Sequence, residues 1–319
     1  MECIDAVRAA TIGGNVQFQQ REARLTLPLR IDGETRIYPI IGHPIGQVKS
    51  PASLSAIMAA RGFNGMVVPL DIQPGDLAGW MEQAPTMRNV DAMIITVPHK
   101  VACLAYCDRA TDRAIASGAV NVMVRHGDAW VGDATDGHGY LDGIEAEGFD
   151  VSGKTALLVG AGGAGSAIAY EILARGAAHL ALHDIDETRR DALIARLNAA
   201  FPGRAGVGST DPRGFALIAN ATPLGMREGD PLPVDITHLK PDQFVADVVT
   251  RPAIPVLIAA ARAAGCRTMP GSGMFDAQAV LLADLVTGSR AIDLNGASLR
   301  QAAPRGEEHH AREGAANNT

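Results

Sequence analysis

The chain of 319 residues is poor in aromatic side chains, at 4%, and has only four cysteines. Four cysteines in a chain of this length are too few for a disulfide framework, so we expect reduced thiols and a cytoplasmic protein. No stretch approaches the roughly 18 consecutive apolar residues that indicate a membrane span. The first residues include Glu2 and Asp5 and lack the apolar segment of a signal peptide.

Positive charge is scarce as well. Lys and Arg total 28 against 35 Asp and Glu, which gives a net charge of −7, and no basic cluster occurs. A nucleic-acid-binding surface needs such clusters, so the composition excludes nucleic acid as a partner. Cysteine and histidine do not form a four-ligand set, and we expect no metal site.

The sequence is instead aliphatic and glycine-rich, with 47% hydrophobic residues and 35 glycines. This composition suits layered α/β packing better than an all-β sandwich, and the length suggests roughly two domains. Strand and helix patterns alternate, which predicts parallel strands joined by crossover helices. The expected strands are 37–41, 66–72, 92–97, 120–124, 155–159, 179–183, 215–219 and 244–248. The expected helices include 50–62, 74–83, 163–173, 187–200, 253–264 and 275–287.

A glycine-rich turn follows the predicted strand that ends at Val159. It has the pattern G-x-G-x-x-G and consists of Gly160, Ala161, Gly162, Gly163, Ala164 and Gly165. The first glycine permits a tight turn, the second lets backbone N–H groups approach a pyrophosphate, and the third lets the helix pack closely on the strand. The helix N-terminus adds partial positive charge for the phosphates. The turn predicts dinucleotide binding; a turn that only aids packing is the alternative.

An acidic residue, Asp184, ends the next predicted strand, 19 residues after Gly165. A carboxylate at this offset accepts hydrogen bonds from the adenosine 2′-hydroxyl and repels a 2′-phosphate. We therefore predict NAD as the preferred cofactor. Arg189 and Arg190 follow one helical turn later, and they leave NADP as the second option. A helix-capping role for Asp184 or Asp186 is the alternative.

Four short polar segments lie at or near predicted strand ends, where open α/β sheets place their ligands. Together they offer a lysine, a carboxylate, an amide and hydroxyl groups. Such an inventory suits the binding of a polyhydroxylated acid and the movement of one proton. The segments are 44–51, 95–100, 118–121 and 132–137.

The chain resembles the shikimate/quinate dehydrogenase family from about Ile37 to about Thr287. The motifs that carry the resemblance are T-V-P-H-K, G-A-V-N, D-x-T-D-G, G-A-G-G-A-G, N-A-T-x-x-G-M and G-x-G-M-x-x-x-Q. The resemblance implies an enzyme that interconverts a cyclic hydroxy acid and its keto acid, by hydride transfer with NAD(P). Its partner would be that small acid, in a monomer or homodimer with no membrane attachment.

The resemblance also implies the fold and the domains. We expect an N-terminal α/β substrate domain with a mostly parallel sheet and a Rossmann dinucleotide-binding domain, with the cleft between them. The substrate domain would comprise residues 34–137 and a returning segment, 272–302. The Rossmann domain would comprise residues 138–271. Residues 1–33 would be an extension and 303–319 a disordered tail.

The family's site residues carry over onto matching positions of this chain. Lys100 and Asp136 would be the catalytic pair. The substrate would contact Ser50, Thr96, Asn121 and Gln278. The cofactor would contact the six residues of the glycine turn and, beyond it, Asp184, Thr222, Val248 and Gly271.

The residues leave two roles open for Lys100. Oxidation of an alcohol needs a group that takes the hydroxyl proton as the hydride departs, and a lysine does so only if its pKa falls. Burial lowers a lysine pKa, whereas the carboxylate of Asp136 raises it. Lys100 is therefore either the proton acceptor or a fixed cation that stabilises the developing alkoxide, with Asp136 orienting the hydroxyl.

Four positions depart from the family pattern. The first serine of the family's Ser-x-Ser motif, which grips the substrate carboxylate, is Val48 here. The usual asparagine two residues before Thr96 is Ile94, and the usual tyrosine after D-V-V is Thr250; Ala134 interrupts D-N-T-D. One alternative is a family dehydrogenase acting on a less polar hydroxy acid. An alternative of another class is an NAD-binding sensor without catalysis.

Overall fold

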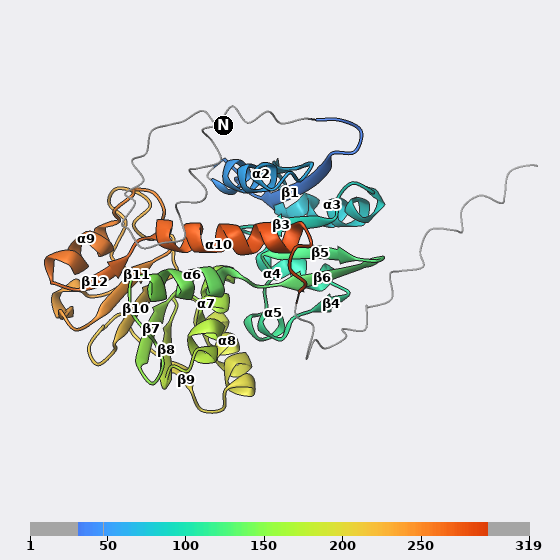
Figure 1. The fold of residues 1–319 in the computed structure, drawn as a ribbon. Helices are drawn as coiled ribbons and strands as arrows, with labels where there is room; N and C mark the ends of the chain where they lie inside the picture. Colours follow the sequence, from blue (N-terminus) through green and yellow to red (C-terminus); the bar gives the residue numbers. More distant parts are fainter. Residues whose placement is uncertain (1–30, 47, 293–319) are drawn as a thin grey trace, which may run out of the picture.

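The computed structural model describes residues 31–46 and 48–292 and contains two sheets of six strands each (Figure 1). This arrangement confirms the predicted α/β class with two mostly parallel sheets. The predicted tail, 303–319, and almost all of the predicted extension, 1–33, lie outside the described residues. None of the described helices is long and apolar enough to cross a membrane.

The first sheet has the strand order β2-β1-β3-β5-β6-β4. Its first three strands are parallel, but β5 is antiparallel to both β3 and β6. The sheet is mostly parallel, as predicted, but the expectation that crossover helices join its strands fails at β5 and β6, because a two-residue turn at Gly127 (φ 64°) joins them directly as a hairpin. The strands are β1 (Arg36–Gly42), β2 (Gly65–Asp71), β3 (Ala92–Ile95), β4 (Arg109–Ala110), β5 (Val122–His126) and β6 (Ala129–Asp133).

The second sheet is parallel throughout, with the order β12-β11-β10-β7-β8-β9. Buried aliphatic runs such as Leu157 and Leu158 in β7 suit a sheet that is covered on both faces. In a parallel sheet, the residues that follow each strand lie along one edge. The strands are β7 (Thr155–Val159), β8 (His179–His183), β9 (Ala205–Val207), β10 (Leu217–Asn220), β11 (Phe244–Asp247) and β12 (Arg267–Met269).

Nine α-helices are assigned within the described ranges: α2 (Ser50–Ala60), α3 (Leu77–Gln83), α4 (Lys100–Cys103), α5 (Asp112–Ser117), α6 (Asp136–Ala146), α7 (Gly163–Ala174), α8 (Glu187–Ala200), α9 (Val256–Ala263) and α10 (Gly271–Val286). Short 3₁₀ turns occupy Pro74–Asp76, Ala84–Thr86, Leu104–Tyr106 and Ile236–His238. The long helix α10 runs between the two sheets (Figure 1). Its Met274 packs in the core of the second sheet, and its Leu282 and Leu285 pack against the first.

Helix α6 was not predicted, because its three glycines lower its intrinsic helix propensity. The same glycines explain why it forms in the folded protein. A Cβ at Gly137 would collide with the carbonyl oxygen of Ala167 in α7, and a Cβ at Gly139 would lie 2.6 Å from the Cβ of Gln278 in α10. Packing against two neighbouring helices therefore holds α6. The predicted domain boundaries fall in the first turns of α6 and α10; the division itself stays a prediction.

A buried carboxyl group, Asp247, ends β11, the strand next to the edge strand β12 of the second sheet. Its Oδ1 accepts hydrogen bonds from Asn220 Nδ2 (3.0 Å) and from the N–H of Val249 (2.9 Å). Its Oδ2 is buried without a hydrogen-bond partner in the described part of the chain. Burial raises the pKa of Asp247 to about 6, against these hydrogen bonds, which lower it.

We expect Asp247 to make the protein less stable as pH rises. The native carboxyl holds its proton more tightly than the unfolded one, so the free energy of unfolding falls between about pH 4 and pH 6, by on the order of 3 kcal/mol at most. Asp247→Asn keeps the Oδ1 acceptor and removes the ionisation. Urea unfolding should show the variant gaining stability over the wild type at pH 7.5 but little at pH 4.5.

Asp211→Asn is the matched control, because the Arg213 side chain holds the pKa of Asp211 at about 2. The difference in unfolding free energy between Asp211→Asn and the wild type should be about the same at both pH values. An equal effect of Asp247→Asn at both pH values would contradict the account.

Candidate active site

Lys100 and Asp136 meet although they come from different strand ends. Lys100 begins α4 after β3, and Asp136 begins α6 after β6. Two antiparallel pairings, β3 with β5 and β5 with β6, leave β3 and β6 pointing the same way, so their carboxyl ends lie at one edge of the sheet. The Lys100 Nζ lies 2.5 Å from Asp136 Oδ2, and the two side chains are 12% and 6% exposed. The pair is therefore formed and largely shielded from water.

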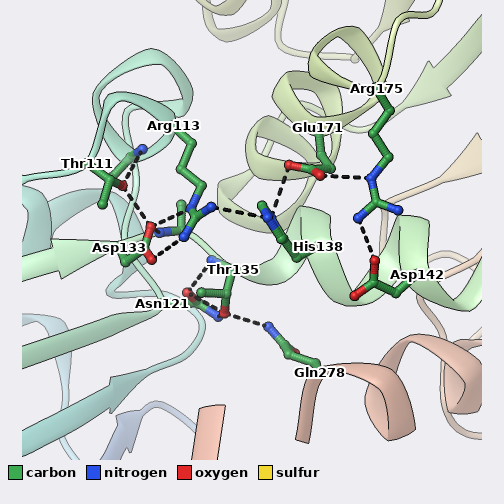
Figure 2. Close-up of polar contacts among 12 residues, drawn as sticks. Thr111, Arg113, Asn121, Asp133, Thr135, His138, Asp142, Glu171, Arg175 and Gln278 are labelled. Carbon is green, nitrogen blue, oxygen red and sulfur yellow. Dashed lines mark hydrogen bonds and ion pairs between the residues drawn. The ribbon is translucent and has the colours of Figure 1, made fainter. Parts of the chain in front are cut away.

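Two side-chain amides hold the other oxygen of Asp136. Gln278 Nε2 donates to Oδ1 at 2.9 Å, and Asn121 Nδ2 donates to it at 3.2 Å. Both amides also donate to the hydroxyl of buried Thr135, and Asn121 Oδ1 accepts the Thr135 N–H at 2.8 Å. Figure 2 shows Asn121, Thr135 and Gln278 in this arrangement. The predicted site residues Lys100, Asn121 and Gln278 thus converge on Asp136.

The other two predicted substrate contacts lie at nearby positions. Ser50 begins α2 and lines a small cavity with Gln278, Phe275 and Leu282. Thr96 follows β3 and is half-buried beside Gly42. Its hydroxyl donates no hydrogen bond to another residue that the structure describes. The structure therefore groups Ser50 with Gln278 and leaves the Thr96 hydroxyl available.

The glycine turn has the shape that the sequence pattern requires. Gly160 adopts φ 104°, in the left-handed region that favours glycine, and a Cβ at Gly165 would collide with the carbonyl oxygen of Gly160. Gly162 precedes α7 in an extended conformation, and no side chain caps the helix. Its first N–H groups are thus available to an anion such as a pyrophosphate, and a dinucleotide fits this cradle.

The turn also borders the Lys100–Asp136 pair. A Cβ at Gly163 would lie 2.8 Å from the Cβ of Lys100, so only a glycine lets the lysine side chain pass this close to the start of α7. The proposed phosphate cradle and the lysine therefore occupy adjoining parts of one site.

Asp184 lies at the end of β8 beside the same turn. Its Oδ2 accepts the N–H of Ala161 at 2.6 Å, and its Oδ1 contacts the Arg189 guanidinium at 2.6 Å. Burial alone would raise the pKa of Asp184, but Arg189 and the backbone N–H groups of Ala161 and Asp186 outweigh it and hold the pKa below its usual value. The side chain is therefore an anion at neutral pH. Asp186 is the residue that caps α8, by accepting the N–H of Arg189.

The remaining predicted cofactor contacts follow neighbouring strands of the second sheet. Thr222 follows β10, and its methyl group would touch a Cβ at Gly160. Val248 follows β11, and Gly271 follows β12; a Cβ at Gly271 would lie 2.5 Å from the carbonyl oxygens of Val248 and Val249. All the predicted cofactor residues thus lie along the carboxyl edge of one parallel sheet, where such sheets bind ligands.

Three of the positions that depart from the family pattern face apolar cores. Val48 packs against the cluster that includes Leu54 and Leu282, and Ile94 belongs to that cluster with 4% of its surface exposed. Ala134 is buried in the neighbouring cluster. Thr250 lies after β11, and its carbonyl oxygen accepts a hydrogen bond from Lys49 Nζ at 3.4 Å.

Sequence reasoning missed several residues around Asp136. Thr135 lies inside the D-x-T-D-G motif, which offered a signal. A second group, in the helices behind Asp136, belongs to no motif, and its members find one another only in the folded chain. These are Arg113, His138, Glu171 and Arg175 (Figure 2).

Comparison with known proteins tests the predicted resemblance. A protein-family profile described as the shikimate dehydrogenase substrate binding domain matches residues 40–123. The shikimate dehydrogenase (NADP(+)) of Rubrobacter xylanophilus is 38% identical over 260 residues, which cover 79% of this chain and 90% of the relative.

Solved structures of dehydrogenases and of a reductase are also similar to this chain. The quinate dehydrogenase of Corynebacterium glutamicum, in complex with NAD, is 30% identical, with a TM-score of 0.72 over 80% of this chain and 94% of that one. The 5-ketofructose reductase of Gluconobacter is 28% identical, with a TM-score of 0.71 over 81% and 95%. Shikimate 5-dehydrogenase of Listeria monocytogenes, in complex with shikimate and NAD, is 25% identical, with a TM-score of 0.75 over 81% and 94%. The predicted resemblance is confirmed: this chain belongs to the shikimate dehydrogenase family.

Proposed function

We propose that the protein is an NAD(P)-dependent oxidoreductase that interconverts a cyclic hydroxy acid of the shikimate or quinate type and its keto acid. The observation that carries this proposal is the buried contact between Lys100 and Asp136 beside the glycine turn. A protein that only senses NAD has no need of such a pair. The relatives, named as shikimate and quinate dehydrogenases, support the substrate class.

In this proposal the chain's own groups handle the proton, while a bound nicotinamide exchanges the hydride. The substrate hydroxyl lies against Lys100 Nζ and the Asp136 carboxylate. Lys100 either takes the hydroxyl proton, or stays an ammonium that stabilises the developing alkoxide while the Asp136 carboxylate takes that proton. Asn121 and Gln278 keep the carboxylate fixed, so its orientation costs little during the reaction.

Replacement of Lys100 should abolish most turnover. Lys100→Met keeps the side-chain length beside Gly163 but removes the ammonium, so we expect kcat to fall by on the order of 10²–10⁴. NADH binding, measured by fluorescence titration, should be nearly unchanged. Lys154→Met is the matched control, because the ammonium of that half-buried lysine contacts the carbonyl oxygen of Asp150 and the ring of Phe149, outside the proposed site. Undiminished turnover by Lys100→Met would contradict a catalytic role for Lys100, whereas a wild-type protein that binds NADH but turns over none of the substrates would support the sensor alternative.

A neutral polyhydroxylated ketone is the competing candidate for the substrate. Val48 removes a hydroxyl that the family uses to grip a carboxylate, and its half-buried side chain, which packs against the cluster that includes Leu54, offers no donor in its place. A neutral polyhydroxylated ketone needs no carboxylate grip, and the Gluconobacter relative is named for such a substrate. The less polar hydroxy acid gains no support, because Ile94 is buried in the apolar core and Val48 is half-buried against the same cluster.

Steady-state assays with shikimate, quinate and 5-ketofructose decide between the substrates. We expect the highest kcat/KM with shikimate or quinate. Val48→Ser should then lower KM for the acid by about tenfold, the effect of roughly one hydrogen bond to a charged group, and leave the neutral ketone unaffected. A higher kcat/KM for 5-ketofructose than for either acid would overturn the proposed substrate class.

For the cofactor, we propose that NAD is preferred over NADP. The ionised Asp184 carboxylate beside the glycine turn supports this choice, because it would repel a 2′-phosphate. The relatives differ in the cofactor that their names give: the Rubrobacter dehydrogenase is named for NADP(+), whereas the Corynebacterium structure is a complex with NAD. Arg189, now paired with Asp184, is the cation that NADP would recruit.

Asp184→Asn tests the cofactor proposal, since it keeps an acceptor for the Ala161 N–H but removes the charge. We expect wild-type kcat/KM to favour NAD, and the variant to shift the ratio towards NADP by about 10- to 100-fold, which corresponds to roughly 1.4–2.8 kcal/mol. Asp186→Asn, which preserves the helix cap, should leave the ratio unchanged. A wild-type preference for NADP would refute the proposal.

We also propose a cytoplasmic location. The support is that Cys103 and Cys266 are buried free thiols. The expectation of a monomer or homodimer stays a prediction.

A further inference from the structure

The guanidinium of Arg113 contacts two residues close to Asp136 in the sequence, one before it and one after it. Arg113 of α5 contacts Asp133 through both carboxylate oxygens, with Nε at 2.6 Å and Nη2 at 2.5 Å. Its third nitrogen, Nη1, lies 3.2 Å from Nε2 of His138. Asp133 precedes Asp136 by three residues, and His138 follows it by two. Arg113 therefore bridges Asp133 and His138, which lie on either side of Asp136 in the sequence (Figure 2).

The contact with Arg113 fixes the tautomer of neutral His138. A guanidinium can only donate, so Nε2 of His138 accepts, and the ring proton resides on Nδ1. Nδ1 lies 3.0 Å from Oε2 of Glu171, within ion-pair distance, but forms no well-formed hydrogen bond in the described part of the chain. His138 is thus one donor and one acceptor, placed between a cation and an anion.

The far end of this chain of contacts is anchored on α7. Glu171 Oε1 accepts from Arg175 Nε at 2.8 Å, and Arg175 continues to Asp142 on α6 at 2.5 Å. Burial would raise the pKa of Glu171, but contacts with His138 and Arg175 outweigh it and lower the pKa, so the group is an anion. Because α7 begins at the glycine turn, the contacts connect the start of α6 to the helix that carries the cofactor cradle.

We propose that His138 is a positioning residue: by joining Arg113 to Glu171, it sets the place of Asp136 relative to Lys100 and the glycine turn. This inference rests on the proposed function, because it concerns the same catalytic pair. Among the described residues, the polar contacts of the His138 side chain are with Arg113 and Glu171, and none is with Asp136 or Lys100. Its effect is transmitted through the backbone of the first turn of α6.

Physical constraints make this turn sensitive to His138. The side chain of Asp136 is held by Lys100, Asn121 and Gln278. Its backbone is placed by the packing of Gly137 on α7 and by the contacts that Asp133 and His138 make with Arg113. An apolar residue at 138 would leave Arg113 Nη1 and Glu171 Oε2 without their shared partner, and the charged groups would shift to find others. A displacement of about 1 Å at a catalytic group can cost on the order of 100-fold in rate.

The first experiment does not depend on activity. Crystal structures of His138→Leu and His138→Gln are compared with the wild type, since Gln supplies one donor and one acceptor and Leu supplies neither. We expect the 2.5 Å separation between Lys100 Nζ and Asp136 Oδ2 to be lost in His138→Leu and retained in His138→Gln. An undisturbed pair in His138→Leu overturns the inference.

The second experiment uses turnover of the best substrate. His138→Leu should lower kcat by roughly 10- to 100-fold with little change in KM, and His138→Gln should restore most of it. His126→Leu, at an exposed histidine in β5, is the matched control and should not change kcat. An equal loss of kcat in the Leu and Gln variants would contradict a role that depends on the donor and the acceptor.

A double-mutant cycle with Glu171→Gln tests the connection itself and remains informative if the Leu variant folds poorly. The cycle pairs it with His138→Ala, which removes both the donor and the acceptor: if His138 acts through Glu171, the kcat losses of the two variants are not additive, whereas additive losses oppose the inference. A wild-type protein that is inactive on every substrate refutes the proposed function instead, and the crystallographic comparison still decides the role of His138.

Discussion

The ion pair between the Lys100 ammonium and the Asp136 carboxylate places demands on much of the surrounding fold. Each residue starts a helix after a strand of the first sheet, and the two helices converge only because β5 reverses the chain twice between β3 and β6. The carboxylate then needs donors for its second oxygen, which Asn121 and Gln278 provide from two further elements. A partly shielded pair of this kind needs such partners, since an unpaired buried charge is costly.

Close helix packing brings this pair to the cofactor edge of the second sheet. Helix α6 approaches α7 at Gly137 and α10 at Gly139, where a Cβ would meet backbone or side-chain atoms. At Gly163 the start of α7 likewise has no side chain, and the Lys100 stem passes there. The glycines that weaken α6 as an isolated helix are thus the residues that let two sheets share one site.

Local motifs made the glycine turn and much of the candidate site predictable from the sequence. The glycine turn carries its own geometric requirement, and Lys100, Asn121, Asp136 and Gln278 lie in motifs that the family resemblance identified. The β5–β6 hairpin was missed although Gly127 and Asp128 offered a turn signal, because regular alternation favoured parallel strands. Arg113, His138 and Glu171 could not be paired from sequence, since their contacts arise from the packing of three helices.

The central claim is that the substrate reacts between the Lys100–Asp136 pair and a nicotinamide held by the second sheet. A crystal structure of the protein with NAD and shikimate tests it most directly. The account predicts the reacting hydroxyl within hydrogen-bond distance of Lys100 Nζ or the Asp136 carboxylate, its carbon facing the nicotinamide, and the pyrophosphate on the N–H groups of the glycine turn. Shikimate bound away from both side chains, or a dinucleotide bound away from that turn, would contradict the account.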